Sequence, residues 1–272
     1  MIADPWHPLR ALTAARIALG RAGGSVPTAA HLDFQLAHAR ARDAVGRTLD
    51  AGRLAGELAS LGAGMVRVAS AAADRREYLL RPDLGRRLCE EGRARLASHA
   101  TRAPAGEPPP DLALIVGDGL SAGAAERHAP PLLARLVPAL RGEGWRLAPI
   151  VVAERARVAL GDEVARALGA SLVVVLLGER PGLTAPESLG VYLTHDPRPG
   201  RVDAERNCVS NVRPEGLGYD AAAHVVGWLV REARRRGLTG VGLREEAPPL
   251  PPAAGVVRAL GGGTAGAAGN AP

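Results

Sequence analysis

Glu179 and Arg180 place an acid and a base directly after the most apolar run of the chain. Six apolar residues, Leu172 to Leu177, lead into Gly178, Glu179, Arg180, Pro181 and Gly182. A continuous apolar run of this length is typical of a strand that is covered on both faces of a sheet. Ligands of open parallel sheets bind just beyond the carboxyl ends of the strands. The pattern therefore predicts a ligand site at Glu179, with an ordinary surface turn as the alternative.

A second polar stretch contains one of the two cysteines of the chain. Residues 203–216, DAERNCVSNVRPEG, show little periodicity and are predicted to form a loop, the kind of segment that often carries function. A catalytic cysteine needs a base and a positive environment. Arg206 offers positive charge to Cys208, but no Cys-His pair can be assigned from the sequence. A site at Cys208 and a buried loop cysteine therefore both remain open.

A glycine-containing loop follows the first strand predicted after residue 110. Gly117, Asp118, Gly119, Leu120, Ser121 and Ala122 match the loose G-x-G-x-x-G/A form of a dinucleotide-binding loop. Glu154 follows the next strand, where an acid can hold a ribose. Against this stands Asp118, which puts a negative charge where a pyrophosphate would bind. A nicotinamide-dependent oxidoreductase is kept as an alternative, and the small residues also admit another nucleotide-like ligand.

His224 belongs to half of a cobalt-binding motif. The motif is Asp-x-His-x-x-Gly, and here His224 and Gly227 are present whereas the position of the Asp is Ala222. His224 is therefore interpreted as a histidine on a helix face. No Ser-His-Asp order, HExxH motif, paired zinc motif or kinase motif is present, so no catalytic residue and no metal ligand is assigned.

The elements that would position these residues alternate between strands and helices. Strands are predicted at residues 112–116, 147–153, 172–177 and 191–194, and helices at 122–140, 158–168 and 221–236, the first of them broken near Pro130 and Pro131. Such alternation implies right-handed crossovers and a parallel sheet. The expected fold class is α/β, with a Rossmann-like parallel sheet over residues 111–246.

The first part of the chain has a different pattern. Residues 1–102 are expected to form a mostly helical domain, with helices near 13–19, 29–45 and 82–99 and a short strand at 65–70. The proline-rich stretch 103–110 is predicted to be the linker between the two domains. Residues 247–272 are rich in Pro, Gly and Ala and are predicted to be a disordered tail.

Composition narrows the classes of partner. The chain has 272 residues with a net charge of +6, and all of its 34 basic residues are arginine. The arginines are scattered without interleaved aromatic residues, so nucleic acid is not an expected partner. No apolar run approaches a membrane span. The polar start MIADPWHPLR does not fit a secretory signal, and the two cysteines form no disulfide framework. We therefore expect a soluble intracellular protein.

Six sequence blocks occur in a characteristic order and spacing. They are ARIALGRAG (15–23), YLLRPDLGRRL (78–88), DGLSA (118–122), RVALGDEVARALGA (157–170), VVVLLGERPGL (173–183) and AERNCVSNVRPEG (204–216). A set of this kind is far more specific than any single motif. With these blocks the chain resembles, over about residues 12–243, the small subunits of ethanolamine ammonia-lyase, an enzyme that depends on adenosylcobalamin.

The resemblance implies a division of labour between two chains. The large subunit of this family is a TIM barrel that binds ethanolamine and carries the catalytic residues. The small subunit covers the corrinoid with its Rossmann-like domain. The adenosylcobalamin is base-on, with its own dimethylbenzimidazole as the lower cobalt ligand, which agrees with the incomplete motif at His224. An adenosyl radical takes hydrogen from ethanolamine, and loss of ammonia then gives acetaldehyde. Such a subunit is not active alone.

The resemblance also implies site residues and an assembly. The family's small-subunit cobalamin contacts fall on Val158, Glu179 and Cys208. From the residues themselves we add three further candidates for cofactor binding: Asp118, Ser121 and Arg206. Trimers of dimers of heterodimers in the cytoplasm are expected, with a bacterial microcompartment as a further location. A scaffold subunit that only supports the large subunit remains as another alternative.

Overall fold

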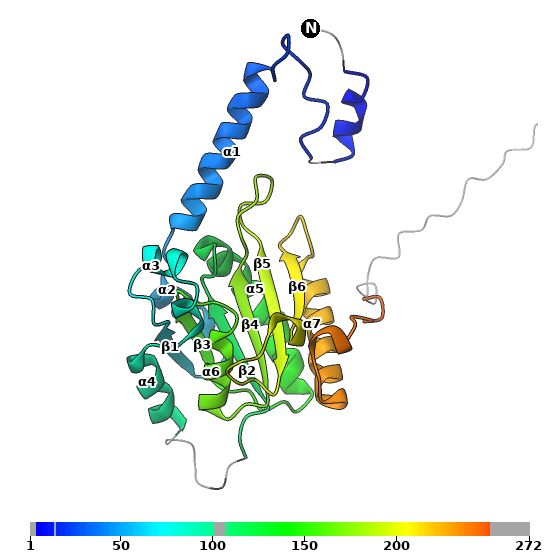
Figure 1. Cartoon of the computed structure of the whole chain (residues 1–272). Coiled ribbons are helices and arrows are strands. Elements are labelled where there is room, and N and C mark those ends of the chain that lie inside the picture. The colour runs from blue at the N-terminus through cyan, green and yellow to red at the C-terminus, as the bar shows by residue number, and fades with distance from the viewer. Residues whose placement is uncertain (1–3, 14, 101–105, 107, 251–272) are drawn as a thin grey trace, which may run out of the picture.

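A six-stranded sheet organises the molecule (Figure 1). The computed structural model describes residues 4–13, 15–100, 106 and 108–250. In spatial order the sheet begins with four parallel strands, β1 (Met65–Ala69), β3 (Ile150–Glu154), β2 (Leu112–Gly117) and β4 (Leu172–Gly178). The carboxyl ends of these four strands therefore meet at one edge, and the chain switches direction across the sheet between β2 and β4.

The other edge of the sheet departs from the predicted parallel arrangement. β5 (Leu189–His195) runs antiparallel to β4, and β6 (Asn207–Val212) runs antiparallel to β5. The expectation of a fully parallel sheet is therefore wrong here. The physical reason is the connection between β4 and β5, which has only the ten residues 179–188 and is too short for a crossover helix. The prediction of a loop over residues 203–216 is also wrong, because β6 lies within it.

Helices cover the two faces of the sheet with separate apolar clusters. On the first face lie α2 (Ala51–Ala59), α5 (Ala122–Gly142) and α7 (Tyr219–Arg236). On the second face lie α4 (Glu90–Ala100) and α6 (Leu160–Leu168). Alternate residues of β4 serve the two clusters: Val174 faces the first and Val175 the second. Both faces of the central strands are buried, as the apolar run at Leu172 to Leu177 predicts.

α5 is continuous through its prolines, so the predicted break near Pro130 and Pro131 is wrong. Both prolines are half-buried, while the helix buries Leu132, Leu133 and Leu136 against the first face. This tertiary packing outweighs the hydrogen bonds that proline removes. The other predicted strands and helices after residue 110 are confirmed, with shifts of a few residues at their ends.

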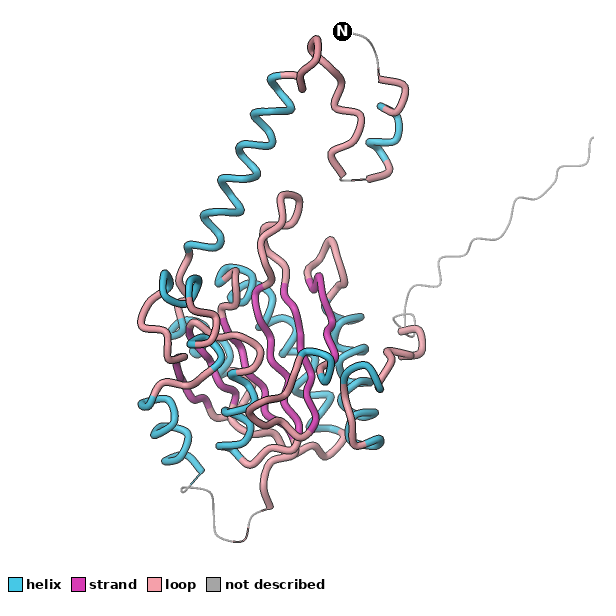
Figure 2. The backbone as a smooth tube through the Cα atoms, in the orientation of Figure 1, coloured by secondary structure: helices cyan, strands magenta, loops and turns pink. Residues whose placement is uncertain are grey.

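The N-terminal part contains both a detached helix and a piece of the sheet. α1 (Thr28–Gly46) has no buried residue and stands away from the sheet (Figure 2). β1 pairs with β3, so the parts before and after the predicted linker at 103–110 share one sheet. The helix expected at 13–19 is not formed in its described residues. A 3-10 turn lies before them, at His7–Ala11.

Short elements complete the described chain. α3 (Arg75–Leu80) lies at the carboxyl edge of the sheet, and 3-10 turns occur at Leu84–Arg86, Asp203–Glu205 and Gly240–Gly242. The predicted disordered tail lies mostly outside the described residues, which end at 250. In the part of the chain that the structure describes, no helix is both long and apolar enough to cross a membrane.

Candidate functional site

Glu179 follows β4 directly and its carboxylate is fixed by two donors. Oε2 accepts a hydrogen bond from the Ser188 hydroxyl at 2.5 Å and from the Asn211 amide at 3.2 Å. The Glu179 amide in turn donates to the Ser188 carbonyl at 2.9 Å. An ionised carboxylate has about four acceptor positions, so Glu179 retains acceptor capacity for a further donor. The side chain is half-buried, so part of it reaches the surface.

The surface beside Glu179 is made by the second face of β5 and β6. A Cβ at Gly190 would lie 3.2 Å from Glu179 and 3.1 Å from the Tyr192 ring, so the absence of a side chain lets both residues pack over the buried glycine. Tyr192 pairs across the sheet with Cys208, which is exposed together with Ser210. α5 and α7 pack against these strands from the first face only. We call Tyr192, Cys208 and Ser210 the open face.

The polar groups on the open face interact with one another. The Cys208 thiol lies 3.2 Å from the Ser210 hydroxyl. Burial raises the pKa of Tyr192, and the neighbouring Cys208 thiol and Glu179 carboxylate raise it further. The Tyr192 hydroxyl therefore stays protonated at neutral pH and remains a hydrogen-bond donor. The arrangement provides one fixed acceptor, one phenol and one exposed thiol on one face of the sheet.

Val158 lies in the turn that leads from β3 into α6. It is half-buried against the cluster of the second face, to which Tyr192 also belongs. Its carbonyl accepts the Gly161 amide at 3.0 Å and so starts the first turn of α6. Val158, Glu179 and Cys208 thus all lie on the second-face side of the molecule, and Glu179 and Cys208 share Tyr192 as a neighbour.

Asp118 and Ser121, two of the candidates from the sequence, are buried, with 2% and 0% of their surfaces exposed. Asp118 Oδ1 accepts the Ala156 amide at 2.9 Å, and Oδ2 pairs with Arg75 Nη1 at 3.1 Å. Ser121 is the N-cap of α5 and accepts the Ala124 amide. Their direct contact with a cofactor stays a prediction, whereas their bonds here hold the loops behind the surface.

Arg206 is buried as well and is occupied by partners inside the protein. It forms a two-pronged ion pair with Asp162 of α6, with Nη–Oδ distances of 2.8 and 2.7 Å. Nη1 also donates to the Thr194 hydroxyl at 2.8 Å. The pair ties the start of β6 to α6, so Arg206 sets the position of the strand that carries Cys208.

The crevice where a dinucleotide would bind is filled by the protein. Leu120 N donates to Gly178 O at 2.9 Å, and a Cβ at Gly178 would overlap the Ser121 carbonyl. At the start of α5 the position for a pyrophosphate is taken: a Cβ at Gly123 would lie 2.6 Å from the Glu187 carboxylate. These two contacts disfavour the nicotinamide alternative.

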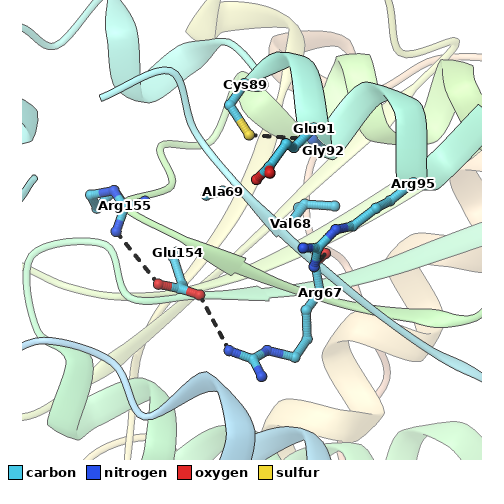
Figure 3. A pocket seen from close by; sticks show the side chains of 9 residues that line it. All are labelled: Arg67, Val68, Ala69, Cys89, Glu91, Gly92, Arg95, Glu154 and Arg155. Atoms are coloured by element: carbon cyan, nitrogen blue, oxygen red, sulfur yellow. Dashed lines mark hydrogen bonds and ion pairs between the residues drawn. The ribbon is translucent and has the colours of Figure 1, made fainter. Parts of the chain in front are cut away.

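A separate cavity of about 230 Å³ lies further along the carboxyl edge, between β1, β3 and the start of α4. Figure 3 shows that Glu154 bridges Arg67 and Arg155 across one side of it, at 3.6 and 3.4 Å. Glu154 is thus occupied by ion pairs rather than directed toward the β2 loop. The lining of this cavity includes none of Val158, Glu179 and Cys208.

His224 lies on α7 and donates from Nε2 to the carbonyl of Pro248 at 2.7 Å. This agrees with its interpretation as a histidine on a helix face. Among the described residues no group of three or more His, Cys, Asp or Glu side chains could hold a metal ion.

Three residues of this region were missed by sequence reasoning: Tyr192, Ser188 and Asn211. Tyr192 had a signal, because it alternates with Val191 and Leu193 in a predicted strand and must face the opposite side. Ser188 and Asn211 had none. Asn211 is held at a φ of +59° beside an irregularity in the pairing of β5 with β6, which depends on the partner strand.

Comparison with known proteins places the chain among named relatives. The family model for the ethanolamine ammonia-lyase light chain (EutC) matches residues 3–244. A protein named ethanolamine ammonia-lyase small subunit from Pseudomonas fluorescens strain SBW25 is 53% identical over 244 residues, covering 90% of this chain and 87% of the relative.

Two further relatives of the same name show a similar sequence identity to this chain. The protein from Ralstonia nicotianae is 54% identical, and that from Azotobacter vinelandii is 55% identical. Each match covers 90% of this chain and 89% of the relative.

Proposed function

The chain belongs to the family of ethanolamine ammonia-lyase small subunits, and on that premise we propose that it holds adenosylcobalamin against a TIM-barrel large subunit. The reaction served is the deamination of ethanolamine to acetaldehyde and ammonia. As a small subunit of this lyase, the chain is part of an enzyme. The observation that carries the proposal is the open face, whose exposed residues adjoin the fixed carboxylate of Glu179.

The residues present fit one side of a corrinoid. A corrin ring is broad, and its rim carries amide side chains that donate hydrogen bonds. Glu179 offers a carboxylate whose orientation is set by Ser188 and Asn211, so little entropy is lost when it accepts such a donor. Gly190 allows Tyr192 to pack beside Glu179, and Cys208 is exposed on the same face. We propose Val158, Glu179 and Cys208 as the contacts, with Asp118, Ser121 and Arg206 supporting them.

The contribution of this chain is binding and orientation. When bound, adenosylcobalamin would supply the radical chemistry that the deamination needs. Glu179 holds the rim of the cofactor by accepting hydrogen bonds, and Val158 packs against it. The ion pair between Arg206 and Asp162 fixes the start of β6 relative to α6, and this sets the position of Cys208. No residue of this chain is assigned to proton or hydrogen transfer.

The division of labour predicts that the purified chain with adenosylcobalamin releases no ammonia from ethanolamine. Activity is expected only after the large subunit is added, because that chain is proposed to bind ethanolamine. The measurement is ammonia release from each chain alone and from the mixture. The molar mass of the mixture, measured by light scattering, tests a second expectation, the trimer of dimers of heterodimers. Ammonia release by this chain alone would refute the division of labour.

α1 is the proposed docking element for the large subunit. Leu32 and Leu36 lie four residues apart on one stripe and are 57% and 51% exposed. Helices in proteins depend mostly on packing of an apolar face, and α1 buries none of its 19 residues. Its C-terminal end is anchored to the body, because Arg47 pairs with Glu126 of α5. The name of the family implies a large subunit, and we propose that this partner covers the stripe of Leu32 and Leu36.

We therefore expect the amides of residues 28–46 to exchange hydrogen more slowly in the complex, by about tenfold or more. Hydrogen exchange with mass spectrometry, with and without the large subunit, is the measurement. α7 serves as the internal control, because Val226, Leu229 and Val230 are already buried in the isolated chain. Equal exchange of α1 in the two samples would contradict docking through this helix.

The proposed function also includes a location. We propose that the complex lies in the cytoplasm, with a bacterial microcompartment as a further location.

A further inference from the structure

Tyr78, from the part of the chain before residue 103, is buried at the carboxyl edge of the sheet. It lies on α3 and is 1% exposed. Its hydroxyl donates to the carbonyl of Ala156 at 3.1 Å. Ala156 is two residues before Val158, in the turn between β3 and α6. Tyr78 thus reaches from a different segment into the turn that carries a proposed cofactor contact.

Both backbone polar groups of Ala156 are held by side chains. The Ala156 amide donates to Asp118 Oδ1 at 2.9 Å, and its carbonyl accepts from Tyr78. The turn therefore has its peptide planes set from two sides, by the β2 loop and by α3. The next residue is fixed too, since the Arg157 amide donates to Gly85 O at 2.9 Å. The backbone directly before Val158 is therefore held by hydrogen bonds at three groups: the Ala156 amide, the Ala156 carbonyl and the Arg157 amide.

Two guanidinium groups hold the Tyr78 ring in place. The Cζ atoms of Arg75 and Arg157 each lie 4.8 Å from the ring centroid, a distance at which cations attract the ring. Gly85 packs directly against the Tyr78 ring, because a Cβ at this position would lie 2.9 Å from it. The ring therefore cannot turn without displacing Arg157, the neighbour of Val158.

The hydroxyl stays a donor over the working pH range. Burial raises the pKa of Tyr78 to about 12, and the Asp118 carboxylate adds to this rise while Arg157 and Arg75 oppose it. The bond to Ala156 is therefore present wherever the protein is folded at ordinary pH.

We infer that Tyr78 is a positioning residue for cobalamin binding, because its hydroxyl sets the Ala156 carbonyl and thereby the placement of Val158. The inference rests on the proposed function. Tyr78 does not touch the cofactor, since it is buried beneath Gly85 and Arg157. Its proposed effect passes through the 155–159 turn.

The test is Tyr78→Phe in the complex with the large subunit. The variant keeps the ring between its arginines and removes only the hydroxyl. We expect the dissociation constant for adenosylcobalamin, measured by absorbance titration, to rise about fivefold, the effect of one lost hydrogen bond. In the cofactor-free complex, hydrogen exchange over residues 155–159 is expected to quicken by a similar factor. With saturating cofactor, kcat should stay unchanged.

Tyr219→Phe is the matched control. The Tyr219 hydroxyl also bonds a partner, His128 Nδ1 at 2.8 Å, and Arg135 lies 5.5 Å from its ring. Its contacts are with α5 on the first face, so the cobalamin dissociation constant should not change. Arg157→Met is a second variant that frees the Tyr78 ring on one side and is expected to weaken cobalamin binding in the same direction.

The outcomes separate the inference from the function it rests on. If the wild-type complex binds no adenosylcobalamin, the proposed function fails and the inference fails with it. If the wild type binds and Tyr78→Phe binds equally well, the inference alone is overturned. A fall in thermal stability in both Tyr→Phe variants, with both dissociation constants unchanged, overturns it too, since Tyr78 would then serve only stability.

Discussion

Asp162→Ala is expected to lower the free energy of unfolding by about 3–5 kcal/mol, because it leaves the buried Arg206 without its counter-charge. Asp162 and Arg206 are 1% and 7% exposed, and two hydrogen bonds join them. The Thr194 hydroxyl and the Arg201 carbonyl also bond Arg206 but carry no net charge. Urea denaturation followed by circular dichroism measures the change.

Two controls separate the lost pairing from a general effect of the substitution. Asp220→Ala breaks an exposed pair with Arg135 and should change stability by no more than about 1 kcal/mol. Asp162→Leu combined with Arg206→Met removes both charges and should restore most of the loss. Wild-type stability in the single variant Asp162→Ala would show that Arg206 reaches solvent, against its position between α6 and β6.

Glu179→Ala is expected to weaken binding of adenosylcobalamin to the complex by about 10- to 100-fold. The variant removes the proposed acceptor, and the expected change corresponds to about 1.4–2.7 kcal/mol of binding free energy. Absorbance titration of the reconstituted complex is the measurement. The fold should stay intact, because Glu179 is half-buried at the rim of the sheet, although the Ser188 hydroxyl and the Asn211 amide lose a partner.

Glu187→Ala is the matched control for Glu179. Both are glutamates of the segment between β4 and β5, but Glu187 pairs with Arg127 on the first-face side. Its loss should leave the cobalamin dissociation constant within about twofold of the wild type. Equal dissociation constants for Glu179→Ala and the wild type would remove Glu179 from the proposed site.

The central strands could be predicted because their signal is local. Leu172 to Leu177 are apolar on both faces, and the pattern places Glu179 directly after a buried strand. β6 could not be found in this way, because it is an edge strand. Only Val209 and Val212 are buried there, and Cys208 and Ser210 face solvent, so the segment has the composition of a loop.

The supporting residues of the site depend on tertiary contacts that no local pattern contains. Arg206 bonds to Asp162, which is 44 positions away in the sequence, and Tyr78 bonds to Ala156, which is 78 positions away. Asp118 was considered for its charge in a glycine loop, whereas its structural partners are Arg75 and the Ala156 amide. The antiparallel direction of β5 did have a signal in the sequence: the ten residues before it cannot contain a crossover helix.

Gly178 has a consequence for how the two chains and the cofactor assemble. Its backbone lies against Ser121 and Leu120 so closely that the crevice at the switch point is closed. The surface that this chain offers is therefore one-sided, and under the proposed function the second side belongs to the large subunit. Cobalamin and the large subunit must then strengthen each other's binding by the same factor, since linkage is reciprocal. Cofactor release and subunit dissociation become two measures of a single free energy of coupling.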